Sequence, residues 1–317
     1  MSGPSAPPAA PRSLTRYAWL SIAAAVVTIG LKSAAFLVTG SVGLLSDAAE
    51  SVVNLVAAIV ALVALRVAAR PADDSHHYGH GKAEYFSAWI EGLMIFVAAG
   101  VIVVSAVRRF LDPQPLESVG LGLAITLLAT AINGAVGVLL LRVGKRHRSM
   151  TLEADGHHLL TDVWTSLGVI VGVALVALTG WERLDPVIAF AVGINILFTG
   201  SRLVARSTSG LMDHALPAKD HGRILEVLER FRSDEVRFHA LQTRESGRHR
   251  FISVHVLVPG AWTVQRGHDL LEDLEDALCA TLSDTEVHTH LEPLEDERAY
   301  KDIHLGLYLG GPGDSDG

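Results

Sequence analysis

The sequence predicts an all-α membrane domain of six helices, followed by a small water-soluble α+β domain. Half of the 317 residues are hydrophobic and only 19% are charged, whereas soluble domains average about 25% charged residues. Residues 213–317 carry 21 acidic and 11 basic side chains, a net charge of −10, whereas residues 1–212 carry 13 acidic and 15 basic ones. The long apolar runs lie in the first two thirds of the chain, and the last third is acidic.

The first two thirds contain six apolar runs of membrane-spanning length. A transmembrane helix needs about 20 mostly apolar residues. Residues 1–13 are rich in Pro, Ala and Ser, and we expect them to form a disordered N-terminal tail. Residues 14–210 should form the transmembrane domain, with spans at 17–38, 42–65, 85–107, 119–141, 159–179 and 186–204.

Basic residues predict the orientation of these spans. The connections after the second and fourth spans contain RVAAR…HGK and RVGKRHR, and connections rich in Lys and Arg face the cytoplasm. Arg108, Arg109 and Arg183 lie on the opposite side. We therefore expect a multi-pass protein of the plasma membrane with both termini in the cytoplasm.

The last third has the pattern of a small α+β domain. Residues 220–231 and 264–282 have helical spacing, whereas 236–245, 250–259 and 286–293 resemble strands. The order α-β-β-α-β predicts an open-faced sandwich over residues 211–306, followed by a flexible tail at 307–317.

Two spans carry polar pairs that are typical of a functional site. Glu50 and Asn54 are four residues apart in the second span, and His158 and Asp162 have the same spacing at the start of the fifth. Each pair projects from one face of its helix, so the two helices can close a four-coordinate site for a divalent metal. The alternative is hydrogen bonding between helices, which we favour for the neighbouring Asp47 and His157.

The connection between the second and third spans contains a second candidate site. Asp73, His76 and His80 are spaced by three and four residues in RPADDSHHYGHGK. Imidazole and carboxylate groups together bind divalent metals well. The alternative is a solvated polar loop without a ligand.

The acidic domain holds nine histidines. His255 faces away from the apolar side of its predicted strand, and His288, His290 and Glu292 share one face of the last strand. The clustering on neighbouring strands favours metal binding, although scattered surface histidines remain the alternative.

Three motifs, TGSVGLLSDAAESVVN, RPADDSHHYGHGK and LEADGHHLLTDVWTS, together strongly resemble the cation diffusion facilitator family. The resemblance runs from the first span to EVHTHLEP. It implies a homodimer of six-span protomers with cytoplasmic ferredoxin-like domains, which exchange metal for protons. It also assigns a transport site (Glu50, Asn54, His158 and Asp162), a loop site (Asp73, His76 and His80) and cytoplasmic sites (His239, His255, His268, His290 and Glu292).

The resemblance implies a divalent metal cargo and no prosthetic group. Well-known family members carry His or Asp, then Asp, where this chain has Glu50 and Asn54. We expect Zn(II) as the cargo, with Fe, Mn, Co and Cd as alternatives. A different class of function, a membrane-bound metal sensor that does not transport, is the main rival.

Overall fold

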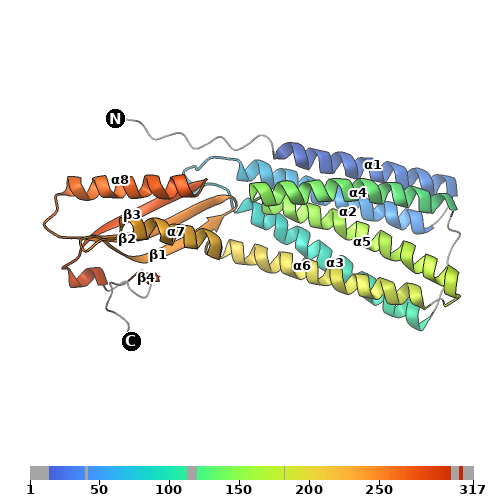
Figure 1. Cartoon of the computed structure of the whole chain (residues 1–317). Coiled ribbons are helices and arrows are strands. Elements are labelled where there is room, and N and C mark those ends of the chain that lie inside the picture. The colour runs from blue at the N-terminus through green and yellow to red at the C-terminus, as the bar shows by residue number, and fades with distance from the viewer. Residues whose placement is uncertain (1–13, 40–41, 113–119, 182, 301–306, 310–317) are drawn as a thin grey trace. The chain divides into compact units, whose positions relative to one another are not determined.

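The computed structural model describes residues 14–39, 42–112, 120–181, 183–300 and 307–309 (Figure 1). The chain divides into two compact units, with the boundary between Ser209 and Gly210. The first unit is helical in its described part, and the second combines helices with a sheet.

The described part of the first unit contains six helices, one for each predicted span: α1 (Thr15–Thr39), α2 (Val42–Ala68), α3 (Ala83–Leu111), α4 (Gly120–His147), α5 (Met150–Thr179) and α6 (Leu184–Leu211). The fifth helix begins nine residues earlier than the predicted start at 159. The first turns of this helix carry Glu153, Asp155 and two histidines, so a search for apolar runs misses these turns. Glu153, Asp155 and His158 are nevertheless buried among the other helices.

Small residues allow the helices of this unit to approach closely. A Cβ atom at Gly156 of α5 would lie 2.9 Å from the Leu141 backbone nitrogen of α4, and one at Gly200 of α6 would lie 2.8 Å from the Phe96 nitrogen of α3. Such contacts between backbones are typical of helices packed in a membrane. In Figure 1, α1, α2, α4 and α5 lie side by side, and α3 runs beside α6.

Four of these helices contain described segments that are long and apolar enough to cross a membrane: Thr15–Ala34, Ala83–Leu111, Ala124–His147 and Pro186–Leu211. In α2, the apolar segment among the described residues is shorter, at Asn54–Ala68. The polar residues predicted to form a site lie in α2 and α5, the two helices without such a segment in the described part.

The second unit follows the predicted order α-β-β-α-β. It comprises α7 (Ala218–Phe231), β1 (Arg237–Ser246), β2 (His249–Val258), α8 (Val264–Thr281), β3 (Thr285–Pro293), the short 3-10 helix η1 (Glu297–Tyr300) and β4 (Leu307–Leu309). The strand order in the sheet is β3-β2-β1-β4, and β2 pairs with β3 in parallel and with β1 antiparallel. Within the flexible tail predicted over 307–317, residues 307–309 form a strand, because Leu307 and Leu309 pair with the free edge of β1; the remaining residues of that prediction lie outside the described part.

The sheet is apolar on one face and carries histidines on the other. The predicted inward residues of β2 (Ile252, Val254, Val256 and Val258) share a core with Leu274 and Leu278 of α8 and with Ile224 and Leu228 of α7. Because side chains alternate along a strand, His255 is directed away from these helices.

Candidate metal-binding sites

Three side chains of the predicted membrane site meet inside the helical unit. Asn54 of α2 and His158 and Asp162 of α5 are all buried. The Asn54 amide lies between the other two groups: its Nδ2 donates to Asp162 Oδ2, and its Oδ1 lies 2.8 Å from His158 Nε2. The structure therefore brings together residues that are 104 and 108 positions apart in the sequence.

These contacts determine the tautomer of His158. Because Asn54 uses its NH2 group toward Asp162, its oxygen must accept from His158, which places a proton on Nε2. The other ring nitrogen, His158 Nδ1, is buried and has no hydrogen-bond partner among the described residues. A metal ion that binds at Nε2 requires this proton to move to Nδ1, because the ligand imidazole is neutral and only its unprotonated nitrogen can bind the metal.

The fourth predicted ligand, Glu50, belongs to α2 one turn before Asn54. Its side chain and that of Asp47 lie outside the described part of the structure. The ligand role of Glu50 and the structural role of Asp47 both stay predictions.

The structure adds a residue that sequence reasoning missed. Asn133 of α4 is 2% exposed, and its Nδ2 lies 3.4 Å from Asp162 Oδ2. Its own Oδ1 is buried without a hydrogen-bond partner in the described residues. A single Asn within the apolar run ATAINGAVG was the available signal, since polar groups at membrane depth are functional candidates.

Two further buried carboxylates were also passed over. Glu91 of α3 accepts a hydrogen bond from Ser87 at 3.1 Å, and Asp155 of α5 accepts one from Ser21 of α1 at the same distance. The second oxygen of each carboxylate has no hydrogen-bond partner within the described chain. Asp155 lies one turn before His158 along α5.

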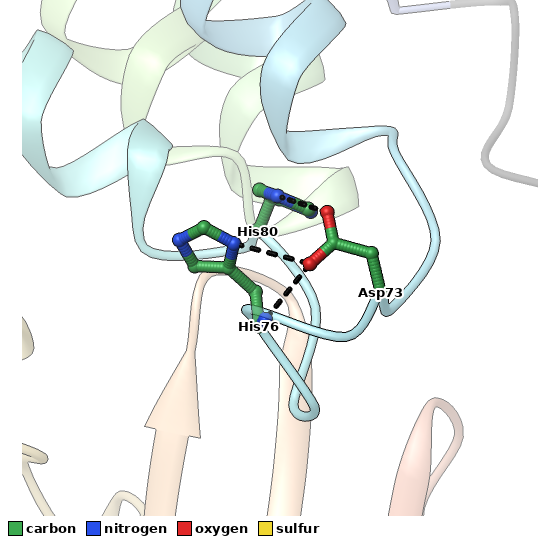
Figure 2. A group of neighbouring side chains, drawn as sticks. All are labelled: Asp73, His76 and His80. Carbon is green, nitrogen blue, oxygen red and sulfur yellow. Dashed lines mark hydrogen bonds and ion pairs between the residues drawn. The ribbon is translucent and has the colours of Figure 1, made fainter.

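The loop residues form a compact cluster, shown in Figure 2. Asp73 Oδ1 lies 3.3 Å from His76 Nδ1, and Asp73 Oδ2 lies 3.3 Å from His80 Nε2. The two imidazole rings are 4.4 Å apart. One carboxylate therefore faces two imidazoles, a set of three groups whose ligand atoms lie within 4.8 Å of one another.

A tight turn shapes this cluster. Asp73 and His76 exchange backbone hydrogen bonds, and Gly79, with a φ of 75°, allows the chain to reverse before His80. Backbone N–H groups of Ser75 and His76 donate to Asp73 Oδ1 at 2.9 and 2.8 Å. These hydrogen bonds, that from Ser75 foremost, lower the pKa of the Asp73 carboxyl. The carboxylate thus stays ionised, as a metal ligand must be.

Strand register builds the third cluster. His239 of β1 lies opposite His255 of β2, which lies opposite His290 of β3. The ladder shifts between His239 and Gln242, where Ala240 has a φ of 49°. A β-bulge of this kind redirects the side chains around it, and it leaves His239 buried at the site.

Glu292 is the common partner of these three histidines. Its Oε2 lies 2.7 Å from His239 Nε2 and 3.1 Å from His255 Nδ1, and its Oε1 lies 3.6 Å from His290 Nε2. His239, His255 and Glu292 meet the geometric requirement for holding a metal ion. The predicted ligand His268 lies apart from them, with 58% of its side chain exposed on α8 and 3.8 Å from Glu272.

Comparison with known proteins identifies the family. Residues 18–212 match the family profile described as the cation efflux transmembrane domain, and residues 216–294 match the cation efflux protein cytoplasmic domain. The chain belongs to the cation diffusion facilitator family. It is a multi-pass membrane protein with a helical transmembrane domain and a small cytoplasmic α/β domain, and its family consists of divalent metal efflux transporters rather than enzymes.

Relatives of known sequence span most of this cation diffusion facilitator. A Synechocystis protein named "Uncharacterized transporter sll1263" is 55% identical over 90% of this chain and 92% of its own length. The "Cation-efflux pump FieF" of Pectobacterium atrosepticum is 31% identical over 89% of this chain and 94% of its own. The solved metal-bound C-terminal domain of the CzcD transporter from Thermotoga maritima is 30% identical, covers 25% of this chain and 92% of that one, and has a TM-score of 0.23.

Proposed function

We propose that the protein exports Zn(II), or a similar divalent ion, from the cytoplasm in exchange for protons. The observation that carries this proposal is the buried contact of Asn54, His158 and Asp162, which joins two helices inside the membrane unit. Polar groups at this depth are costly unless they pair or serve a pathway. Glu50, one turn from Asn54, completes the proposed ligand set.

The ligand chemistry of His158 and Asp162 supports proton exchange. A ligand imidazole is neutral and a ligand carboxylate is ionised, so metal binding releases a proton from a doubly protonated His158 or from a protonated Asp162. A site that opens to the cytoplasm would exchange bound protons for metal, and one that opens to a more acidic exterior would do the reverse. Protons and metal thereby compete for one site without a second pathway.

Zinc is our first choice of cargo. One imidazole with two carboxylates is an acceptable tetrahedral set for zinc, and divalent affinities rise toward zinc in most mixed nitrogen and oxygen sites. Asn54 replaces an anionic ligand by a neutral amide, which lowers affinity and relaxes discrimination. Iron, manganese, cobalt and cadmium are therefore the alternatives.

The arrangement we propose for the whole chain has six spans in residues 14–210 and a ferredoxin-like cytoplasmic domain in 211–306. Both termini face the cytoplasm, and the protein lies in the plasma membrane as a homodimer. The acidic domain repels its twin, and cations bound at His239, His255 and Glu292 would lower that repulsion. Metal binding there would favour one arrangement of the two domains. His268, exposed on α8, is available to a second copy.

A sensor that does not transport is the second candidate function. The observation in its favour is that two of the clusters, at the Asp73 loop and on the sheet, lie outside the membrane helices. Such clusters can respond to metal without any passage of the ion.

Reconstitution into proteoliposomes separates the two functions. With an imposed proton gradient, we expect the wild-type protein to accumulate Zn(II), whereas His158→Ala and Asp162→Ala do not. Ser207→Ala is a matched control, because Ser207 is also buried and donates to the Tyr85 carbonyl away from the proposed ligands. Metal binding without uptake in the wild type would favour the sensor.

A further inference from the structure

We infer that Asn133 is a specificity-determining residue of the transport site, and that its amide oxygen joins the metal ion's ligands. The inference rests on the proposed function. The starting observation is that α4 places a buried amide beside Asp162, with Nδ2 3.4 Å from Asp162 Oδ2 and with Oδ1 lacking a hydrogen-bond partner in the described structure.

A packing role does not explain this oxygen. Buried carbonyl oxygens in native proteins are hydrogen-bonded in the great majority of cases, because an unpaired one loses its interaction with water and gains nothing. A leucine of similar size would fill the same space in α4 without that penalty. The amide is retained at a position 2% exposed, which points to a ligand that satisfies the oxygen when it binds.

The two amides of the site share one arrangement. Asn54 and Asn133 both direct Nδ2 toward the same oxygen, Asp162 Oδ2. An ionised carboxylate only accepts hydrogen bonds, so each amide presents its NH2 group to it. When Asp162 holds a cation, the amide oxygens rather than the NH2 groups are favoured on the side of the ion. Rotation of either amide about its Cβ–Cγ bond exchanges nitrogen for oxygen at nearly the same place.

The second amide changes which ions the site accepts. With both amide oxygens turned inward, Asn54, Asn133 and Asp162 join the proposed ligand Glu50 as four oxygen ligands, against one nitrogen ligand from His158. Zinc is satisfied by four ligands in a tetrahedron, whereas manganese prefers carboxylate and carbonyl oxygens in a larger, octahedral set. Asn133 therefore favours Mn(II) relative to Zn(II) and broadens the range of cargo.

Competition for zinc uptake tests the inference with the full-length protein in proteoliposomes. The measurements are the KM for Zn(II) and the Mn(II) concentration that halves zinc uptake. Asn133→Leu removes the amide at similar volume. In this variant we expect the Mn(II) concentration that halves zinc uptake to rise about tenfold, with a much smaller change in the zinc KM. Asn133→Asp keeps an oxygen and adds a negative charge, so a lower Mn(II) concentration than in the wild type should halve its zinc uptake. Ser207→Ala should leave the ratio of the two values unchanged.

Each outcome decides the inference. If Asn133→Leu weakens the apparent affinity for Zn(II) and for Mn(II) equally, Asn133 has only a structural role. If the ratio of the half-inhibiting Mn(II) concentration to the zinc KM is unchanged in both variants, Asn133 does not belong to the site. If Asn133→Leu does not fold, Asn133→Asp decides alone: stronger manganese competition supports the inference, and unaltered competition overturns it. Absence of metal uptake by the wild type would instead overturn the proposed function, and the inference with it.

Discussion

The membrane site and the histidine cluster of the sheet use similar residues but satisfy them differently. In the membrane site, the uncharged amide of Asn54 lies between His158 and Asp162 and contacts both. On the sheet, three histidines converge on one carboxylate, Glu292. The described part of the first set offers one imidazole and one carboxylate separated by a neutral group, which suits release. The second set gathers three imidazoles around one carboxylate, which suits retention.

Burial sharpens this difference. Asn54, His158 and Asp162 of the membrane site are all buried, whereas on the sheet exposure increases from His239, with a fully buried side chain, to His290, with 66% exposed. Charge inside a membrane must be neutralised within the protein, whereas the cluster on the sheet is open to water at His290. We therefore assign the exchange of cargo to the helices and metal-dependent regulation to the sheet.

The largest expected effect separates the two regions by function. His158→Ala should lower zinc uptake by more than about 100-fold, because even groups that support metal ligands contribute about 10- to 100-fold. His239→Ala should retain uptake at saturating zinc. The measurement is the initial rate of uptake into proteoliposomes, with dimer content checked for each variant. Equal losses of zinc uptake in His158→Ala and His239→Ala would contradict the division of roles between the helices and the sheet.

The second prediction concerns retention on the sheet. Glu292→Gln should lower zinc affinity of the cytoplasmic cluster by about 10- to 100-fold, since it removes the carboxylate that three histidines share. Calorimetry on full-length protein carrying His158→Ala would measure it without a contribution from the membrane site. The control is Glu286→Gln, which changes another carboxylate of β3, 3.1 Å from His288. A similar loss in both variants would contradict the assignment.

The third prediction moves the membrane site toward retention. Asn54→Asp restores a negative charge and should raise zinc affinity there by about tenfold, because ionised oxygens bind divalent cations more strongly than amides do. Turnover should fall as release slows. The KM and maximal rate of zinc uptake report both effects. An unaltered KM would place Asn54 outside the metal's ligands.

The smallest expected effect concerns acid stability of the cytoplasmic unit. Burial lowers the pKa of the His249 imidazole, so the unfolded chain binds this proton more readily than the folded one does. The stabilisation is present above the unfolded pKa of about 6.5 and is lost as pH falls below it. Thermal unfolding between pH 7.5 and 5 should show a smaller acid-dependent loss in His249→Gln than in the wild type. Identical losses would show that His249 does not contribute.

The sequence predicts the architecture because its signals are repeated. Six apolar runs mark six helices, and alternation along residues 250–259 assigns Ile252 and Val254 to the core and His255 to the opposite face. The spacing alone predicts that His158 and Asp162 belong to one site, and likewise Asp73 and His76, because the members of each set lie close together in the sequence.

The remainder depends on contacts between distant segments. Asn133 is one amide in a largely apolar stretch of α4, and its place beside Asp162 depends on how α4 packs against α5. The short strand β4 follows from the free edge of β1 rather than from its own three residues. His268 matches the family pattern, but its position on α8 separates it from the histidines of the sheet within one chain.

The central claim is that metal and protons exchange at the site formed by Asn54, His158 and Asp162. Simultaneous recording of zinc uptake and luminal pH in proteoliposomes tests it most directly. We predict that zinc entry is accompanied by proton exit in the wild type, and that both fluxes disappear together in Asp162→Ala. Zinc uptake that continues in that variant, or that proceeds in the wild type without any proton flux, would contradict the account.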